Sequence, residues 1–155
     1  MIRIALAFLV ALVVASITAA IIQTQFNIAA LQDWSVEIDW ALRKEATFHD
    51  IINFSPTFAI ILGTSLLVSL PVAYFIDRRR PNPEPIWFLV GGAVGLWVAF
   101  LIVDALLPMP TLIAVNRTLP GLVSMVACGG LAGYLFARVS KISSYSSHQS
   151  EGAAA

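Results

Sequence analysis

Residues 86–107 form an uninterrupted run of apolar and small side chains in which Asp104 is the single charge. An α-helix rises 1.5 Å per residue, so a helix of this length crosses the roughly 30 Å of hydrocarbon in a bilayer. A carboxylate inside such a helix is costly, which suggests a structural partner or a functional role. The run therefore predicts a transmembrane helix and makes Asp104 a candidate site residue.

Three more runs of similar length occur at residues 4–22, 57–76 and 119–137. Only 12% of the 155 residues are charged and the mean hydropathy is +0.85, whereas soluble domains are about one quarter charged. These features predict an all-α integral membrane protein with four transmembrane helices, in which residues 1–141 form a single domain. Residues 142–155 are small and polar without periodicity, and we expect a disordered cytoplasmic tail there.

The basic residues are distributed unevenly between the two ends of the expected spans. One end carries Arg3, Arg78, Arg79, Arg80, Arg138 and Lys141, and the other carries Arg43, Lys44 and Arg117. Because positive residues concentrate on the cytoplasmic side of a membrane, both termini are predicted to be cytoplasmic, and residues 23–55 to face outward. Four short spans with an arginine-rich turn favour a multi-pass protein of the bacterial inner membrane.

The outward segment between the first two spans is ambiguous in its secondary structure. Apolar and polar side chains alternate over residues 34–42, which indicates a half-buried strand. Residues 41–46 are strong helix formers, and no partner strand is evident. We therefore expect an interfacial amphipathic helix at the membrane surface, while the choice between helix and strand for residues 31–46 stays open. Ser55 and Pro56 then predict the N-cap and first turn of the second span.

Asp104 lies three residues from the outward end of its run, about 4–5 Å below that end at 1.5 Å per residue. On a helical wheel it lines up with Trp97, Phe100 and Leu101, and we expect this face to meet a polar partner or cavity rather than lipid. Arg117 follows on the same side of the membrane. A structural pair between Asp104 and Arg117 is the preferred interpretation. The alternatives are a binding or proton-relay role, with Trp97 beside the carboxylate, and an exposed carboxylate without a role.

Glycines spaced four apart occur in two of the expected spans. Gly91 and Gly95 lie in the third span, and Gly129 and Gly133 lie in the fourth. Small residues at this spacing let helices approach closely in lipid. Gly95 is about 180° from Asp104 on the wheel at 100° per residue, which follows from 3.6 residues per turn. We therefore predict that the glycine face of the third helix packs on the glycines of the fourth.

His49, Asp50 and Glu45 are weak candidates for a metal site outside the second span. Glu45 and His49 are four residues apart and would share a helical face, but two or three loosely spaced ligands are not a recognisable site. The interpretation favoured here is a surface histidine beside a carboxylate. The spans carry no nucleophile elbow, phosphate loop or paired catalytic carboxylates. We therefore expect neither an enzyme nor a bound metal or cofactor.

The functional expectation follows from helix packing rather than from chemistry. Small-residue faces and few polar residues at depth favour a non-catalytic accessory or scaffolding subunit, or a self-associating membrane protein. Its expected partners are the lipid bilayer and either further copies of itself or other membrane-protein subunits. The net charge of zero gives no indication of nucleic acid. The alternative is a small-solute or ion transporter or channel that uses Asp104 and Arg117 near its outward mouth.

Overall fold

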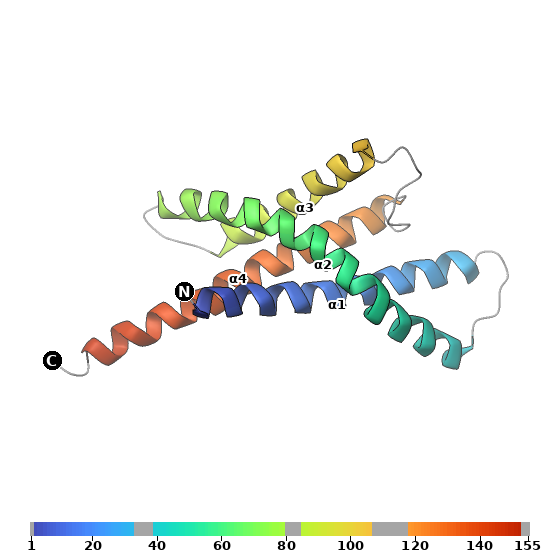
Figure 1. Cartoon of the computed structure of the whole chain (residues 1–155), viewed down its shortest axis with the longest axis horizontal. Helices are drawn as coiled ribbons and strands as arrows, with labels where there is room; N and C mark the ends of the chain where they lie inside the picture. Colours follow the sequence, from blue (N-terminus) through green and yellow to red (C-terminus); the bar gives the residue numbers. More distant parts are fainter. Residues whose placement is uncertain (1, 33–38, 80–84, 107–117, 153–155) are drawn as a thin grey trace.

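The computed structural model describes residues 2–32, 39–79, 85–106 and 118–152, and these residues form four helices (Figure 1). The helices are α1 (Ile2–Gln32), α2 (Trp40–Arg78), α3 (Ile86–Leu106) and α4 (Leu119–Gly152). All four contain a stretch long and apolar enough to cross a membrane, which in α4 is Leu119–Ser140. The prediction of an all-α chain with four such helices is confirmed, and the described residues contain no strand.

The helices pack as a four-helix bundle in which each touches its neighbours in the chain. α1 packs on α2 and α4, and α3 packs on the same two helices, while α1 and α3 make no contact among the described residues. α2 and α4 touch only slightly across the centre. The N-terminal end of α1 and the C-terminal end of α4 lie at the same end of the bundle (Figure 1). Four antiparallel helices therefore return the chain to the side on which it begins.

The inside of α1 is lined by small residues, and the outside by large ones. Ala7, Ala11, Ala15 and Ala19 are completely buried, whereas larger side chains on the same helix, such as Leu9, are exposed. Large exposed apolar surfaces are rare in soluble monomers. Small residues at the helix contacts are typical of membrane bundles, where lipid and helix interior are equally apolar. The distribution therefore supports lipid as the surrounding solvent.

The glycines of α3 divide between two partner helices. Gly92 lies against the Gly129 backbone, and a Cβ atom at Gly133 would collide with the Phe88 carbonyl, so α3 and α4 touch backbone to backbone. Gly91 and Gly95 face α2 instead, where they lie against Ala73, Ser69 and Ser65. The prediction that Gly91 and Gly95 pack on α4 is therefore wrong about the partner. Gly92, one residue along, occupies that contact.

A separate interfacial helix is not present among the described residues. α1 continues past the expected end of the first span to Gln32, and α2 begins at Trp40, so the outward segment extends the two helices instead. Asp39 caps α2, and its carboxylate accepts a 2.6 Å hydrogen bond from the Trp40 backbone N–H. Pro56 lies inside α2 and does not start it. The expected boundary failed because residues 41–46 are strong helix formers and because Arg43 and Asp50 are hydrogen-bonded to α1.

Two further expectations concern the end of the chain and the centre of the outward segment. Residues 142–152, which belong to the expected tail, continue α4 to Gly152. Residues 33–38, the centre of the segment that was ambiguous between helix and strand, lie outside the described residues. At the start of α4, the Thr118 hydroxyl accepts a 3.2 Å hydrogen bond from the Gly121 N–H, which is a side-chain N-cap.

Candidate functional site

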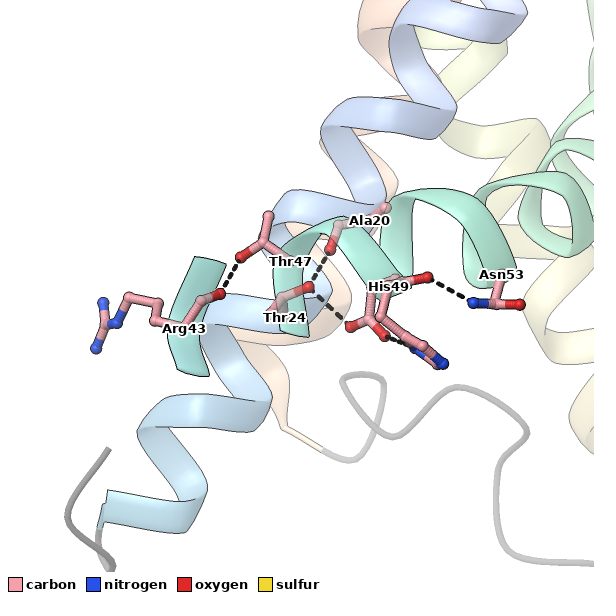
Figure 2. Close-up of polar contacts among 7 residues, drawn as sticks. Ala20, Thr24, Arg43, Thr47, His49 and Asn53 are labelled. Carbon is pink, nitrogen blue, oxygen red and sulfur yellow. Dashed lines mark hydrogen bonds and ion pairs between the residues drawn. The ribbon is translucent and has the colours of Figure 1, made fainter. Parts of the chain in front are cut away.

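A polar cluster lies where α1 and α2 cross, and it joins the two helices through side-chain contacts (Figure 2). The Thr24 hydroxyl on α1 is 2.7 Å from Asp50 Oδ2 on α2. On the other side of that carboxylate, His49 Nδ1 lies 3.7 Å from Asp50 Oδ1. Thr24 is fully buried, whereas the His49 side chain is 70% exposed. The cluster therefore runs from the helix interface to the surface.

The Thr24 hydroxyl has one proton to donate but lies within hydrogen-bond distance of two acceptors. It lies 2.9 Å from the Ala20 carbonyl oxygen of its own helix as well as 2.7 Å from Asp50 (Figure 2). A hydroxyl donates one hydrogen bond, although it can accept two. With an ionised Asp50, the proton serves either the carbonyl or the carboxylate. A side chain at position 50 that could donate to the Thr24 oxygen would satisfy both contacts at once.

A second polar link holds the outer end of α2 to α1. Arg43 Nη1 donates a 3.1 Å hydrogen bond to Gln25 Oε1. Thr47 donates a 2.8 Å hydrogen bond to the Arg43 carbonyl within α2. The two links, Thr24 with Asp50 and Gln25 with Arg43, come from consecutive residues of α1 and from two turns of α2. They explain why both helices continue beyond their apolar stretches.

The sequence-predicted metal residues do not assemble into a metal site among the described residues. His49 and Asp50 are adjacent in space, but no group of three or more His, Cys, Asp and Glu side chains lies close enough to hold an ion there. Glu45 is exposed on α2. The carboxylate of Asp50 instead binds Thr24, which sequence reasoning did not single out. The signal that could have found it is the polar run Gln23, Thr24 and Gln25 directly after the first apolar stretch.

Asp104 is exposed near the C-terminal end of α3 and makes no ion pair within the described residues. Arg117, its expected partner, lies outside the described residues, so their pairing stays a prediction. Phe100, which the wheel placed on the same face as Asp104, is buried in the core at 2% exposure. Trp97 is 45% exposed on the same helix, and its position beside the carboxylate stays a prediction.

Asp104 and Trp97 belong to a continuous outward stripe that we name the α3 seam. The α3 seam consists of Val90, Val94, Trp97, Leu101 and Asp104, and every member is exposed. Successive members are alternately four and three residues apart, which is the spacing at which one helix meets another in a left-handed pair. None of the other three helices covers this stripe.

Buried polar groups occur at both ends of the bundle, and the sequence did not reveal them. Asp77, near the end of α2 and next to the arginine-rich turn, is 6% exposed. Gln23 and Ser16 are buried on α1. The Ser55 hydroxyl donates a 3.3 Å hydrogen bond to the Ser16 carbonyl and so joins α2 to α1. A polar residue next to an apolar run is a weak signal, because such positions are usually solvated.

The fold and these contacts define a four-helix bundle with the composition of a multi-pass membrane protein. Comparison of the chain with protein-family models, with curated proteins and with solved structures finds no match. Any functional assignment therefore depends on the geometry of the chain itself.

Proposed function

We propose that the protein is a non-catalytic accessory subunit in a bacterial inner membrane. In this role, its α3 seam packs against a helix of another membrane protein. The single observation that carries the proposal is the position of Asp104. It is exposed on the α3 seam and forms no ion pair among the described residues, which do not include Arg117. A polar group on the outer face of a membrane helix is stabilised when a neighbouring helix supplies a hydrogen-bond donor.

The chemistry of Asp104 favours a different protein over a second copy as the partner. In a twofold pair of parallel α3 seams, each Asp104 would lie beside its own equivalent, because the same residues meet across the axis. Two carboxylates at that spacing repel each other. A helix that carries a basic or amide side chain at the same depth would satisfy the carboxylate instead. We therefore favour the role of an accessory subunit over self-association.

The orientation in the membrane is part of the proposal. The chain begins and ends at the same side of the bundle, together with Arg78 and Arg79 at the end of α2. The positive-inside rule then supports cytoplasmic termini. Under this orientation Asp104 lies near the outer surface, where a charge costs much less than at the bilayer centre. Reporter fusions test the orientation directly. A reporter that is active in the cytoplasm is fused to each terminus, and one that is active outside the cytoplasm is fused after residue 106.

Site-specific photo-cross-linking in native membranes tests the partner. A photo-reactive residue at Val94, on the α3 seam, should give one cross-linked product of constant mass, while one at Val68, which is 71% exposed on α2, should not. Asp104→Leu should abolish the Val94 product without lowering the thermal stability of the purified chain. A product at twice the mass of the chain would mean self-association. Equal products from Val94 and Val68, or a Val94 product that survives Asp104→Leu, would contradict the proposal.

A further inference from the structure

Beyond the crossing point the outer ends of α1 and α2 diverge (Figure 1). A hollow lies at this outer end, lined mostly by residues of α2 and by one residue of α1. Its volume is about 330 Å³, and it is open to the outside. The lining combines two cations, Arg43 and Lys44, with the aromatic rings of Trp40 and Phe48. Gln25 contributes from the α1 side. The hollow is distinct from the α3 seam and from the contact between Thr24 and Asp50.

The charge that the described residues bring to this hollow is of one sign. Among those residues, the charged side chains that line it are Arg43 and Lys44, and none of the lining side chains is a carboxylate. Within the described part of the chain neither cation forms an ion pair. Arg43 is held in place by its 3.1 Å hydrogen bond to Gln25, which leaves further guanidinium N–H donors for a ligand. Two adjacent cations with one of them fixed are suited to a phosphate group.

The apolar part of the hollow is exposed. Trp40 is 67% exposed and Phe48 is 66% exposed, although both are large apolar side chains. Tryptophan is enriched where a membrane meets water, because its ring is apolar and its N–H can stay hydrated. Basic residues next to exposed aromatic rings therefore match a ligand with an anionic head and an apolar body.

The lengths of the helices place the hollow near the membrane surface. At 1.5 Å per residue, α1 is about 46 Å long and α2 about 58 Å, against roughly 30 Å of hydrocarbon and 40–45 Å with the head groups. The end of α1 that carries Gln25 and the end of α2 that carries Arg43 therefore extend beyond the hydrocarbon. Phe48 lies five residues after Arg43, about 7–8 Å further along α2 towards the apolar stretch. A phospholipid in the adjoining leaflet presents its phosphate and its acyl chains in the same order.

We propose that this hollow binds the head group of an anionic phospholipid, with the phosphate at Arg43 and Lys44 and the apolar part along Trp40 and Phe48. The surrounding leaflet supplies this ligand at high local concentration. The site would hold a lipid at the junction of α1 and α2, and so fix the splay of their outer ends.

Native mass spectrometry of the full chain in detergent tests this site, with phosphatidylglycerol and phosphatidylcholine added separately at equal concentration. Lys44→Gln should weaken phosphatidylglycerol binding about fivefold, the equivalent of the roughly 1 kcal/mol per charge found near anionic membranes. Arg43→Gln combined with Lys44→Gln should weaken phosphatidylglycerol binding further and phosphatidylcholine binding by a smaller factor, because the choline cation already offsets the phosphate charge of phosphatidylcholine. Phe48→Gln should weaken the binding of both lipids equally, because it removes apolar contact and no charge.

The matched control is the double variant Arg78→Gln with Arg79→Gln, two adjacent cations at the opposite end of the same helix. It should leave phosphatidylglycerol binding unchanged. An equal loss in both double variants would show a general effect of charge and overturn the site. Unchanged phosphatidylglycerol binding, both in Lys44→Gln and in the Arg43 and Lys44 double variant, would also overturn the site. Displacement of the lipid by free glycerol phosphate at the same concentration would overturn the lipid as ligand, because the apolar part would then contribute nothing.

Discussion

Thr24 on α1 lies 2.7 Å from the Asp50 carboxylate on α2, across 26 residues of sequence, and this contact marks the point where the two helices cross. Its position explains why the outward segment is not a separate interfacial helix. Each helix continues past its apolar stretch because the other supplies a polar partner there. The crossing thereby connects the membrane-spanning part of the bundle to its outer end.

Thr24→Val should destabilise the protein, because valine keeps the shape of threonine and removes the hydroxyl. Hydrogen bonds to charged groups contribute about 1.5–3 kcal/mol, so a loss of this size in the free energy of unfolding is expected. Thermal unfolding in detergent, followed by circular dichroism, gives the measurement. Thr18→Val is the matched control, since the Thr18 hydroxyl donates to the Val14 carbonyl within its own helix. The control should change stability by less than about 0.5 kcal/mol; equal losses in both variants would rule out a stabilising role for the contact.

Asp50→Asn should be tolerated, whereas Asp50→Ala should not. An asparagine N–H can donate to the Thr24 oxygen, and the Thr24 proton is then free for the Ala20 carbonyl, so both contacts are satisfied. Asp50→Ala removes the hydrogen bond between the two helices and should cost about 1.5–3 kcal/mol, the usual contribution of a hydrogen bond to a charged group. The same unfolding measurement distinguishes them, with Glu45→Ala as an exposed control on α2. If asparagine destabilises as much as alanine, the carboxylate charge is what the site requires.

Ala15→Leu should disrupt the packing of α1, because Ala15 is completely buried at a helix contact and leucine is much larger. Overpacking of this kind typically costs about 1–3 kcal/mol and sometimes more. Val13→Leu is the control, since Val13 is 53% exposed on the same helix. Stability of the two variants in detergent is the measurement. A tolerated Ala15→Leu would mean that α1 does not pack through its alanines.

The number of helices could be predicted from the sequence, but their contacts could not. Four apolar runs determine four helices because a helix satisfies its own backbone hydrogen bonds without help from neighbours. The ends of α1 and α2 depend on Thr24 and Asp50, which are far apart in sequence. Local propensity gives no information on such a pairing.

The third helix shows the same division between local and tertiary information. Residues 91–95 contain three glycines, and the spacing of Gly91 and Gly95 marked them for the α4 contact. In the structure Gly92 makes the contact with α4 instead. The backbone of α3 at Phe88 and Gly92 lies against Gly129 and Gly133 of α4. A rotation of one residue along a helix is 100°, and only the neighbouring helices determine it. α3 carries apolar side chains on every face. Its sequence therefore does not indicate which face is buried.

Gly133→Ala and Gly130→Ala, three residues apart on α4, should have opposite effects on stability. A Cβ atom at Gly133 would collide with the Phe88 carbonyl oxygen and lie 2.8 Å from its carbon, so the backbones of α3 and α4 must separate. A Cβ at Gly130 would lie 3.4 Å from the Leu89 oxygen and 3.5 Å from the Ala93 Cβ, which is ordinary contact. Gly133→Ala should therefore cost about 1–3 kcal/mol through overpacking.

Gly130→Ala should instead leave stability unchanged or raise it by up to about 1 kcal/mol, because alanine loses less backbone freedom than glycine in a helix. The free energy of unfolding of the two variants in the same detergent gives the comparison, and each serves as the control for the other. Similar losses in both would mean that the α3 and α4 backbones are equally close at the two positions. Two neutral substitutions would mean that the helices do not touch through Gly133, and the close backbone contact would have to be abandoned.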